Sequence, residues 1–283
     1  MIQSVCVAGA GTMGSGIAQV AAAAGHPTVL FDLNEAVLEK AQTAIQKNFN
    51  WLVEKQKLTP HQAQEQFSRI VFTSDLASCR ADLVIEAIIE KLDAKLNLFQ
   101  QLHEINTADC LFASNTSSLS INQLQASLPR PERVAGLHFF NRAPLMKLVE
   151  VVAGDQTDTG IVEQLTALCR SWGKVPVVCK DAPGFIVNRV ARHYYLEAMK
   201  QVELGLASVE TIDAAMEAAG FKMGPFKLMD LIGMDINYAV SQQVYEAFGK
   251  ELRFTPSPVQ AAKVAAGELG RKSGKGFYEY PPK

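Results

Sequence analysis

The feature that most constrains the fold is a run of spaced glycines between an apolar segment and an amphipathic one, VCVAGAGTMGSGIAQV. It places Gly9, Gly11 and Gly14 directly after a buried strand and at the start of a helix. In a strand–turn–helix unit, these glycines allow a tight turn, close approach of a pyrophosphate to the backbone, and close packing of helix on strand. The segment therefore predicts a dinucleotide-binding domain. A tight turn that binds no nucleotide is the alternative.

An acidic residue at the end of the second predicted strand indicates which dinucleotide is bound. Asp32 ends the run PTVLFD, 18 residues beyond Gly14. A carboxylate there accepts hydrogen bonds from ribose hydroxyls and repels a 2′-phosphate. The next residues, Leu33 and Asn34, offer no arginine for such a phosphate. The predicted cofactor is therefore NAD, and NADP is disfavoured.

The order of segments predicts two domains. The first two-thirds of the chain alternates short apolar runs with helical patterns, which is typical of a parallel sheet covered by helices. From about Phe185 onward every strong segment has helical periodicity. We predict an α/β, Rossmann-type, doubly wound and mostly parallel sheet domain over residues 1–183, followed by an all-α domain over 184–283.

Composition narrows the class of partner and the compartment. The 283 residues carry a formal net charge of −2, which disfavours a nucleic-acid or membrane-surface binder. No apolar stretch is long enough to span a bilayer, and the chain begins with a strand-like run, so neither a membrane span nor a signal peptide is expected. The five cysteines are scattered without a CxxC pair, which indicates a reducing cytoplasm and no metal site.

Two apolar runs in VAGLHFFNRAPLMKLVE contain one histidine, His138, and one glutamate, Glu150. An unpaired buried ion costs several kcal/mol, so a charge that ends an apolar strand needs a partner or exposure. A core histidine and a surface glutamate at a strand end are the plain alternative.

An ordered set of motifs resembles the NAD-dependent 3-hydroxyacyl-CoA dehydrogenases over essentially the whole chain. The motifs are GAGTMG, ASNTSSLSI, GLHFFN, KLVEVV, PGFIVNR and GRKSGKGFYEY. The resemblance implies NAD as the cofactor, an acyl-CoA substrate, and reversible oxidation of a (3S)-3-hydroxyacyl-CoA to a 3-oxoacyl-CoA. It also implies that the C-terminal domain serves substrate binding and forms a homodimer, or a multiple of one. Long apolar faces after Phe185 fit such an interface.

The resemblance pairs His138 with Glu150 across adjacent strands. The chemistry agrees, because oxidising a secondary alcohol needs a base that titrates near neutrality, and a carboxylate can fix the tautomer of its ring. The resemblance also implies that Ser117 hydrogen-bonds the substrate oxygen and that Asn188 contacts the substrate. By themselves, Ser117 would be a helix N-cap and Asn188 an interdomain hydrogen bond.

The resemblance adds residues to the cofactor site. Thr12 and Met13 lie within the glycine turn, Asn115 lies in ASNTSS, and Glu90 in EAIIEKLDAK matches a glutamate near the nicotinamide. Taken alone, Glu90 would be an acid in the first turn of a helix.

The phosphates of CoA need cations, and a helical arm at about 35–68 is expected to supply them. The first helix of this arm ends in LVEKQK, which contains Lys55 and Lys57. The family places CoA near this arm. A solvated helix face is the alternative for these lysines.

Two arginines depart from the commoner family pattern. Arg142 stands where the family usually has proline, and Arg192 replaces an aliphatic residue four positions beyond Asn188, on the same helix face. Segments such as SWGKVPV and NRVARHYYLEA resemble the branch that oxidises 3-hydroxyadipyl-CoA in phenylacetate breakdown. The carboxylate of that acyl chain needs a cation. Arg192 is the expected partner and Arg142 the second candidate, with structural salt bridges as the alternative for both.

Three alternative functions stay open. They are an ordinary short-chain 3-hydroxybutyryl-CoA dehydrogenase, a Rossmann dehydrogenase of a free hydroxy acid, and a non-catalytic NAD-binding protein. The set of Ser117, His138, Glu150 and Asn188 argues against the last of these. Members of the adipyl branch often carry a second homologous C-terminal part. This chain ends at YEYPPK, so the sequence leaves open whether it is a short member or a portion of a longer one.

Overall fold

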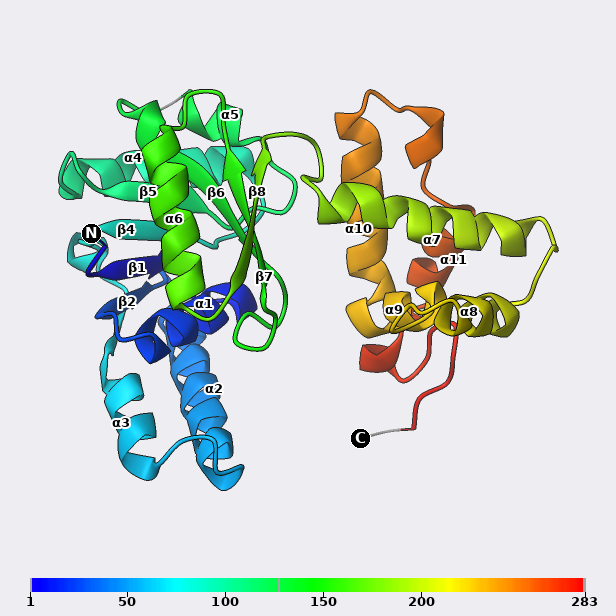
Figure 1. Ribbon diagram of the computed structural model, residues 1–283, viewed down its shortest axis with the longest axis horizontal. Helices are drawn as coiled ribbons and strands as arrows, with labels where there is room; N and C mark the ends of the chain where they lie inside the picture. The colour runs from blue at the N-terminus through cyan, green and yellow to red at the C-terminus, as the bar shows by residue number, and fades with distance from the viewer. Residues whose placement is uncertain (1, 127, 282–283) are drawn as a thin grey trace. The chain divides into compact units, whose positions relative to one another are not determined.

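The computed structural model describes residues 2–126 and 128–281. The chain divides into two compact units, Met1–Ala182 and Pro183–Lys283. This division falls one residue from the boundary expected from the change in periodicity. Figure 1 shows the elements of both units.

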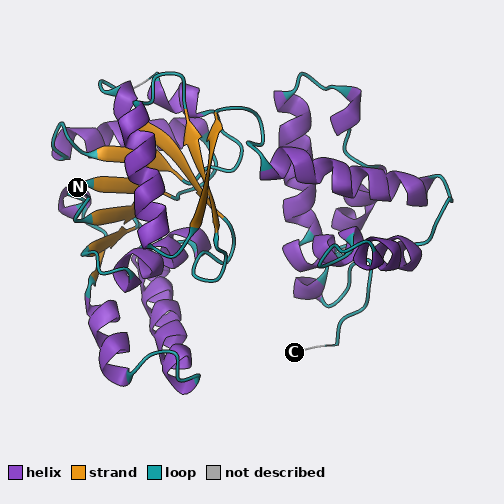
Figure 2. Ribbon diagram, in the orientation of Figure 1, coloured by secondary structure: helices purple, strands orange, loops and turns teal. Residues whose placement is uncertain are grey.

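The N-terminal unit is built on an eight-stranded sheet with the order β3-β2-β1-β4-β5-β6-β7-β8. The strands are β1 (Val5–Ala8), β2 (Thr28–Phe31), β3 (Ile70–Thr73), β4 (Leu83–Glu86), β5 (Leu111–Ser114), β6 (Val134–Phe139), β7 (Leu148–Ala153) and β8 (Val175–Lys180). Among these described strands, β6 and β7 form the antiparallel pair and the other neighbours are parallel. The predicted fold class, a mostly parallel sheet with flanking helices, is confirmed (Figure 2).

Buried strands explain why the sequence reads as short apolar runs. All four residues of β1, β4 and β5 are buried, because helices cover both faces of a parallel sheet. The helices of this unit are α1 (Thr12–Ala23), α2 (Glu35–Glu54), α3 (Pro60–Ser68), α4 (Leu92–Ile105), α5 (Ile121–Gln125) and α6 (Thr159–Ser171).

The predicted helical arm is the pair α2 and α3, which extends beyond one edge of the sheet (Figure 1). Thr59 caps α3 in a reciprocal arrangement with Gln62, and Pro60 is its first residue. Thr59 and Gln62 satisfy N–H groups at the start of α3, and the fixed φ of Pro60 favours a helix, so α3 begins here. Phe49 of α2 packs edge-to-face on Phe67 of α3 and joins the two helices.

The C-terminal unit is helical. Its helices are α7 (Val187–Glu203), α8 (Val209–Ala218), α9 (Pro225–Ile232), α10 (Met234–Ala247) and α11 (Pro258–Ala265). Its core is a cluster of buried apolar residues, namely Tyr195, Ala198, Met199, Ile212, Phe226, Met229 and Met234. Helical periodicity with one apolar face predicts this arrangement.

Two buried aspartates organise the end of this unit. Asp213 accepts hydrogen bonds from the N–H groups of Phe226 and Lys227 at the start of α9, at 2.9 and 3.0 Å. Asp230 accepts from the N–H groups of Phe277 and Tyr278, at 2.9 and 3.0 Å. The first pair of bonds joins α8 to α9, and the second pair anchors the C-terminal segment on α9.

The glycines of GRKSGKGFYEY make that anchoring possible. A Cβ added to Gly276 would lie 2.1 Å from Asp230 Oδ1, and one added to Gly270 would lie 2.3 Å from the Asp230 carbonyl oxygen. The motif therefore has a packing reason, because only glycine lets this segment approach the carboxylate so closely.

No helix within the described ranges is long and apolar enough to cross a membrane.

Candidate active site

The glycine turn has the geometry that a bound pyrophosphate requires. Gly9 has φ +109°, and a Cβ added there would lie 2.6 Å from the Ala87 carbonyl oxygen. A Cβ on Gly14 would lie 1.7 Å from the Gly9 carbonyl oxygen, so the helix can pack here only with glycine. A Cβ on Gly11 would meet no described atom within 4 Å beyond its chain neighbours, which leaves the backbone open to a ligand.

The start of α1 is also suited to phosphate. Its N-cap is Gly11, and no side chain among the described residues caps its first N–H groups. Thr12 and Met13 are the first residues of this helix. Open N–H groups at a helix N-terminus, together with the positive end of its dipole, favour an anion.

Asp32 is held by backbone N–H groups directly after β2. Its Oδ2 accepts the Ala10 N–H at 2.9 Å, and its Oδ1 accepts the Asn34 N–H at 3.0 Å. These bonds orient the carboxylate just beyond the parallel strands β1 and β2. The position fits NAD, whose ribose hydroxyls bind an acid at this point of the fold.

His138 and Glu150 face each other across the antiparallel strands β6 and β7. They are direct register partners, and His138 Nδ1 lies 2.7 Å from Glu150 Oε2. Both side chains are buried, at 5% and 1% exposure, so the plain alternative of a surface glutamate is wrong. The ring of Phe140 packs on the imidazole with centroids 4.5 Å apart. A buried histidine with a carboxylate on one nitrogen is oriented for proton transfer through the other.

A hydrogen bond joins the loop after β5 to strand β6. Asn115 Oδ1 accepts the N–H of Phe139, the neighbour of His138, at 2.9 Å. Ser117 lies in the same loop, and its N–H donates to Glu90 Oε1 at 2.9 Å. The expectation that Ser117 alone would be a helix N-cap is wrong, because Ser120 caps α5.

Glu90 does not lie in the first turn of a helix, so the role expected for it without the family resemblance, that of a first-turn helix acid, is wrong. It precedes Lys91, the N-cap of α4. Its carboxylate accepts hydrogen bonds from the hydroxyls of Thr116 and Ser118 as well as from Ser117. Burial alone would raise the pKa of Glu90, but the charge of Lys95 and these bonds outweigh burial and lower it.

Sequence reasoning missed two buried ionic residues that support this loop. Lys95 Nζ lies 2.6 Å from Glu86 Oε1 and 3.1 Å from Glu90 Oε2. Glu86 also accepts the hydroxyl of Ser114 at 2.6 Å. Burial raises the pKa of Glu86 despite these partners. Glu86 ends the apolar run ADLVIEA, and a charge at the end of a buried strand is the signal that would have found it.

Arg192 does not serve the predicted role. Its side chain is 3% exposed, and its Nη1 donates to Asn237 O and Ser241 Oγ of α10, each at 2.9 Å. Burial lowers its pKa to about 10. The expectation that Arg192 receives a substrate carboxylate is therefore wrong, and so is the alternative of a salt bridge, since its bonds go to neutral groups of its own unit. Asn188 lies in the first turn of the same helix, α7.

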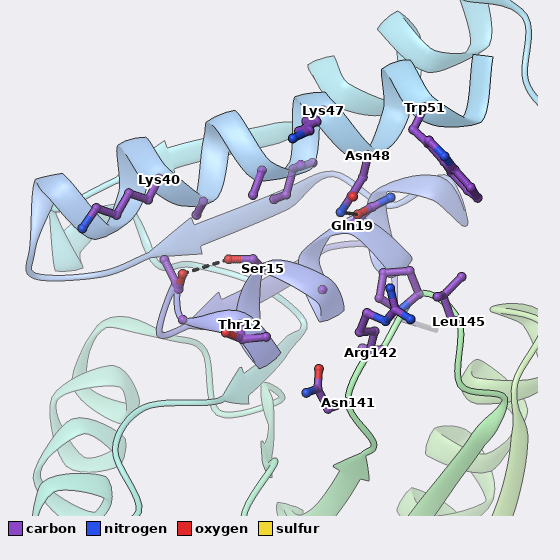
Figure 3. A pocket seen from close by; sticks show the side chains of 18 of the residues that line it. Thr12, Ser15, Gln19, Lys40, Lys47, Asn48, Trp51, Asn141, Arg142 and Leu145 are labelled. Carbon is purple, nitrogen blue, oxygen red and sulfur yellow. Dashed lines mark hydrogen bonds between the residues drawn. The ribbon is translucent and has the colours of Figure 1, made fainter. Parts of the chain in front are cut away.

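A groove of about 780 Å³ runs beside the glycine turn. Its walls are α1, α2 and the loop 141–145 (Figure 3). The arm cations on its lining are Lys40 and Lys47, whereas Lys55 and Lys57 lie beyond the end of α2 and outside the lining. Lys57 does not line the groove itself. Its Nζ lies 5.5 Å from the ring centre of Trp51, which is one of the lining residues.

Fold and site together define a class of protein. Strands β1, β4, β5 and β6 are parallel, so the glycine turn and the end of β6 with His138 lie at the same edge of the sheet. A dinucleotide turn, an acid for the ribose, and a buried histidine–carboxylate pair at one sheet edge are the parts of a nicotinamide-dependent oxidoreductase.

The family follows from comparison with known proteins. Residues 4–182 match the family model described as 3-hydroxyacyl-CoA dehydrogenase, NAD binding domain, and residues 184–280 match the C-terminal domain of the same family. The chain belongs to the NAD-dependent 3-hydroxyacyl-CoA dehydrogenases, a family of oxidoreductases. The predicted family, enzyme class and NAD cofactor are thereby confirmed.

Individual relatives differ in length and in the substrate they are named for. The chain is 50% identical to 3-hydroxyadipyl-CoA dehydrogenase of Escherichia coli K12, covering 99% of its own length and 59% of the relative. It is 43% identical to the mitochondrial hydroxyacyl-coenzyme A dehydrogenase of Rattus norvegicus, covering 99% and 92%. The crystal structure of an (S)-3-hydroxybutyryl-CoA dehydrogenase from Ralstonia eutropha covers all of both chains, with TM-score 0.94 and 37% identity.

Proposed function

We propose that this protein catalyses the reversible NAD-dependent oxidation of a (3S)-3-hydroxyacyl-CoA to the 3-oxoacyl-CoA. The observation that carries the proposal is the buried pair of His138 and Glu150, with 2.7 Å between Nδ1 and Oε2, at the sheet edge of the glycine turn. Such a pair suits a reaction in which one proton leaves a hydroxyl while hydride leaves the neighbouring carbon.

The chain's own residues handle the proton. Glu150 engages Nδ1 of His138, so the proton from the substrate hydroxyl passes to Nε2, and the carboxylate stabilises the imidazolium that forms. When bound, NAD supplies the hydride acceptor. Ser117 and Asn188 are proposed to bind the substrate, and Glu90 and Asn115 to shape the cofactor side of the site. The bonds from Glu90 to the Ser117 loop support that role.

The groove beside α2 is proposed to hold the CoA part of the substrate. Apolar residues such as Val37, Ala41 and Leu52 line it, and cations lie along its walls. A largely apolar groove with cations suits a pantetheine chain that ends in phosphates.

For the acyl group, we propose 3-hydroxyadipyl-CoA, in line with the name of the Escherichia coli relative at 50% identity. Its place in phenylacetate catabolism belongs to the same proposal. 3-Hydroxybutyryl-CoA is the second candidate. It is favoured by the internal bonds of Arg192, which remove the cation first expected to bind an acyl carboxylate.

We further propose that the protein is cytoplasmic and forms a homodimer, or a multiple of one, through its C-terminal unit. All five cysteines are free thiols, which suits a reducing compartment. The C-terminal unit exposes large apolar side chains, among them Leu204, Leu206 and Leu252. Exposed apolar surface commonly marks an interface. Light scattering at micromolar concentration should give a dimer or its multiple, and a monomer would contradict this.

Initial rates with NADH test the function directly. The panel is acetoacetyl-CoA, 3-oxoadipyl-CoA and a free 3-oxo acid, each also measured with NADPH. We expect reduction of the thioesters, a higher kcat/KM for 3-oxoadipyl-CoA, and a strong preference for NADH because of Asp32. Equal use of NADPH would refute the role of Asp32. Reduction of the free acid alone would refute the proposed substrate class.

A further inference from the structure

The charges that line the groove are all of one sign. Among the described residues, its lining includes Lys40 and Lys47 on α2 and Arg142 on the facing loop (Figure 3), and no aspartate or glutamate. Lys40 and Lys47 are seven residues apart, about two helical turns, so they lie on one face of α2. A concave surface with cations on both walls attracts a polyanion.

These three cations are available to a ligand. All three side chains belong to exposed residues, and no ion pair among the described residues involves any of them. By contrast, the half-buried Arg69 and the exposed Arg130 and Arg253 each have a carboxylate partner within 4 Å. The groove cations therefore keep their full charge for a bound anion.

Lys174 holds the loop that carries Arg142 in place through hydrogen bonds to its backbone. Lys174 is 8% exposed, and its Nζ donates to Ala143 O and, at 2.9 Å, to Met146 O. On the other side, Gly16 of α1 allows close approach, because a Cβ there would lie 3.1 Å from Pro144 Cδ. The backbone of Arg142 is thus positioned by its neighbours, which reduces the cost of ordering it around a ligand.

We propose that Arg142, opposite Lys40 and Lys47, binds a phosphate group of the CoA carrier. This inference rests on the proposed function and assigns the phosphate-binding residues of its groove. CoA carries a diphosphate and a 3′-phosphate, and a guanidinium pairs with phosphate through two parallel N–H donors. Arg142 therefore determines the affinity for the nucleotide part of the substrate.

The location of Arg142 favours a phosphate over the carboxylate of an acyl chain. Ser117, His138 and Glu150, which surround the reacting centre, are absent from the groove lining. Arg142 shares its lining with Lys40, Asn48 and Trp51 instead, along the helical arm. A cation on this wall meets the part of the thioester that is distant from the reacting carbon.

The test compares substrates that differ at one end only. Wild type and Arg142→Gln are assayed with NADH and acetoacetyl-CoA, 3-oxoadipyl-CoA, and acetoacetyl-pantetheine, which lacks the nucleotide. We expect KM to rise about tenfold for both CoA thioesters, as for a lost charge-assisted pair, with kcat unchanged. The KM for acetoacetyl-pantetheine should not change. Added salt should narrow the difference between the enzymes.

Arg80→Gln is the matched control, because Arg80 is exposed, lies outside the groove lining, and its loss changes the net charge equally. It should leave all three KM values unchanged. An effect of Arg142→Gln on 3-oxoadipyl-CoA alone would overturn the inference in favour of an acyl carboxylate. Equal effects on all three substrates, or none, would also overturn it.

A binding measurement separates this inference from the proposed function. Calorimetry with free CoA should show about tenfold weaker binding to Arg142→Gln than to wild type, whether or not the enzyme reduces any thioester. If wild type reduces no 3-oxoacyl thioester, the proposed function fails while this measurement still decides the phosphate site. Equal CoA affinity of the two proteins overturns the site.

Discussion

Each unit buries two carboxylates among its described residues, and the two units satisfy them with different partners. In the N-terminal unit, Glu86 and Glu150 are 0% and 1% exposed, and they pair with the side chains of Lys95 and His138. In the C-terminal unit, Asp213 and Asp230 are equally buried, at 0% and 1%. Their partners are backbone N–H groups and tyrosine hydroxyls.

The nature of the partner decides what a buried carboxylate does. An amide N–H does not titrate, so an aspartate that accepts from amides fixes the position of a loop or helix start. An imidazole or ammonium does titrate, so a carboxylate beside it shifts the balance between its protonation states. We infer that buried charge serves the proposed active site in the N-terminal unit, through proton transfer at Glu150 and positioning at Glu86, and architecture in the C-terminal unit.

The largest expected effect is on turnover in the N-terminal unit. His138→Ala removes the general base and should lower kcat by about 10²–10⁴-fold. Its affinity for NADH, measured by calorimetry, should stay close to that of wild type, because the glycine turn is untouched. Wild-type kcat in the variant would remove His138 from the mechanism.

The next effect falls on stability in the C-terminal unit. Asp230→Asn keeps the shape but turns an amide NH₂ toward donors, so unfolding should become easier by about 2 kcal/mol. Thermal melting measures this, with the exposed Glu251→Gln as the control. kcat below the transition should change little. If Asp230→Asn lost much of its kcat without losing stability, Asp230 would not be a structural carboxylate, and the contrast between the two units would fail.

A smaller effect is expected at Glu86, which acts through Lys95 and Glu90. Glu86→Gln should lower kcat about tenfold, because small displacements of the Ser117 loop are costly to catalysis. KM for NADH and the melting temperature should change less, and the exposed Glu104→Gln should change neither. A fall in melting temperature with unchanged kcat would make this ionic network structural, like that of Asp230.

The smallest effect belongs to a surface carboxylate of the C-terminal unit that pairs with two lysines. Hydrogen bonds from Lys263 and Lys275 lower the pKa of Glu268 to about 2. A folded-state pKa below the unfolded value gives stability that is present above about pH 4 and is lost as pH falls toward about 2. Glu268→Gln should therefore melt slightly below wild type at pH 7, with a gap that narrows in acid. If the difference in melting temperature between the two proteins widened in acid, the predicted direction of the pH dependence would be wrong.

The parts of the site that the sequence predicted depend on local geometry. The glycine turn and Asp32 lie within one strand–helix–strand unit, where spacing alone determines position. The pairing of His138 with Glu150 came from the family resemblance, and the structure agrees because the two residues lie opposite each other on consecutive antiparallel strands. The fold class followed from the sequence pattern, because alternating buried runs and helices leave few arrangements.

The parts that were missed depend on distant segments. Helical spacing placed Arg192 near Asn188, but α10, which begins more than 40 residues later, decides that its guanidinium is buried. The groove needs the loop 141–145 beside α2, and this separation in the chain hid Lys40 and Lys47. Glu86 was missed although it ends a buried strand, because its partner Lys95 follows an irregular segment.

A double-mutant cycle on kcat tests the central claim, that His138 and Glu150 act as one proton-transferring pair. The four enzymes are wild type, His138→Ala, Glu150→Gln and the double variant, assayed with NADH and one 3-oxoacyl-CoA. Because Glu150 acts through the imidazole, the double variant should lose no more than about threefold beyond His138→Ala. Losses that multiply across the two single variants would show that Glu150 acts independently of His138 and would contradict the account.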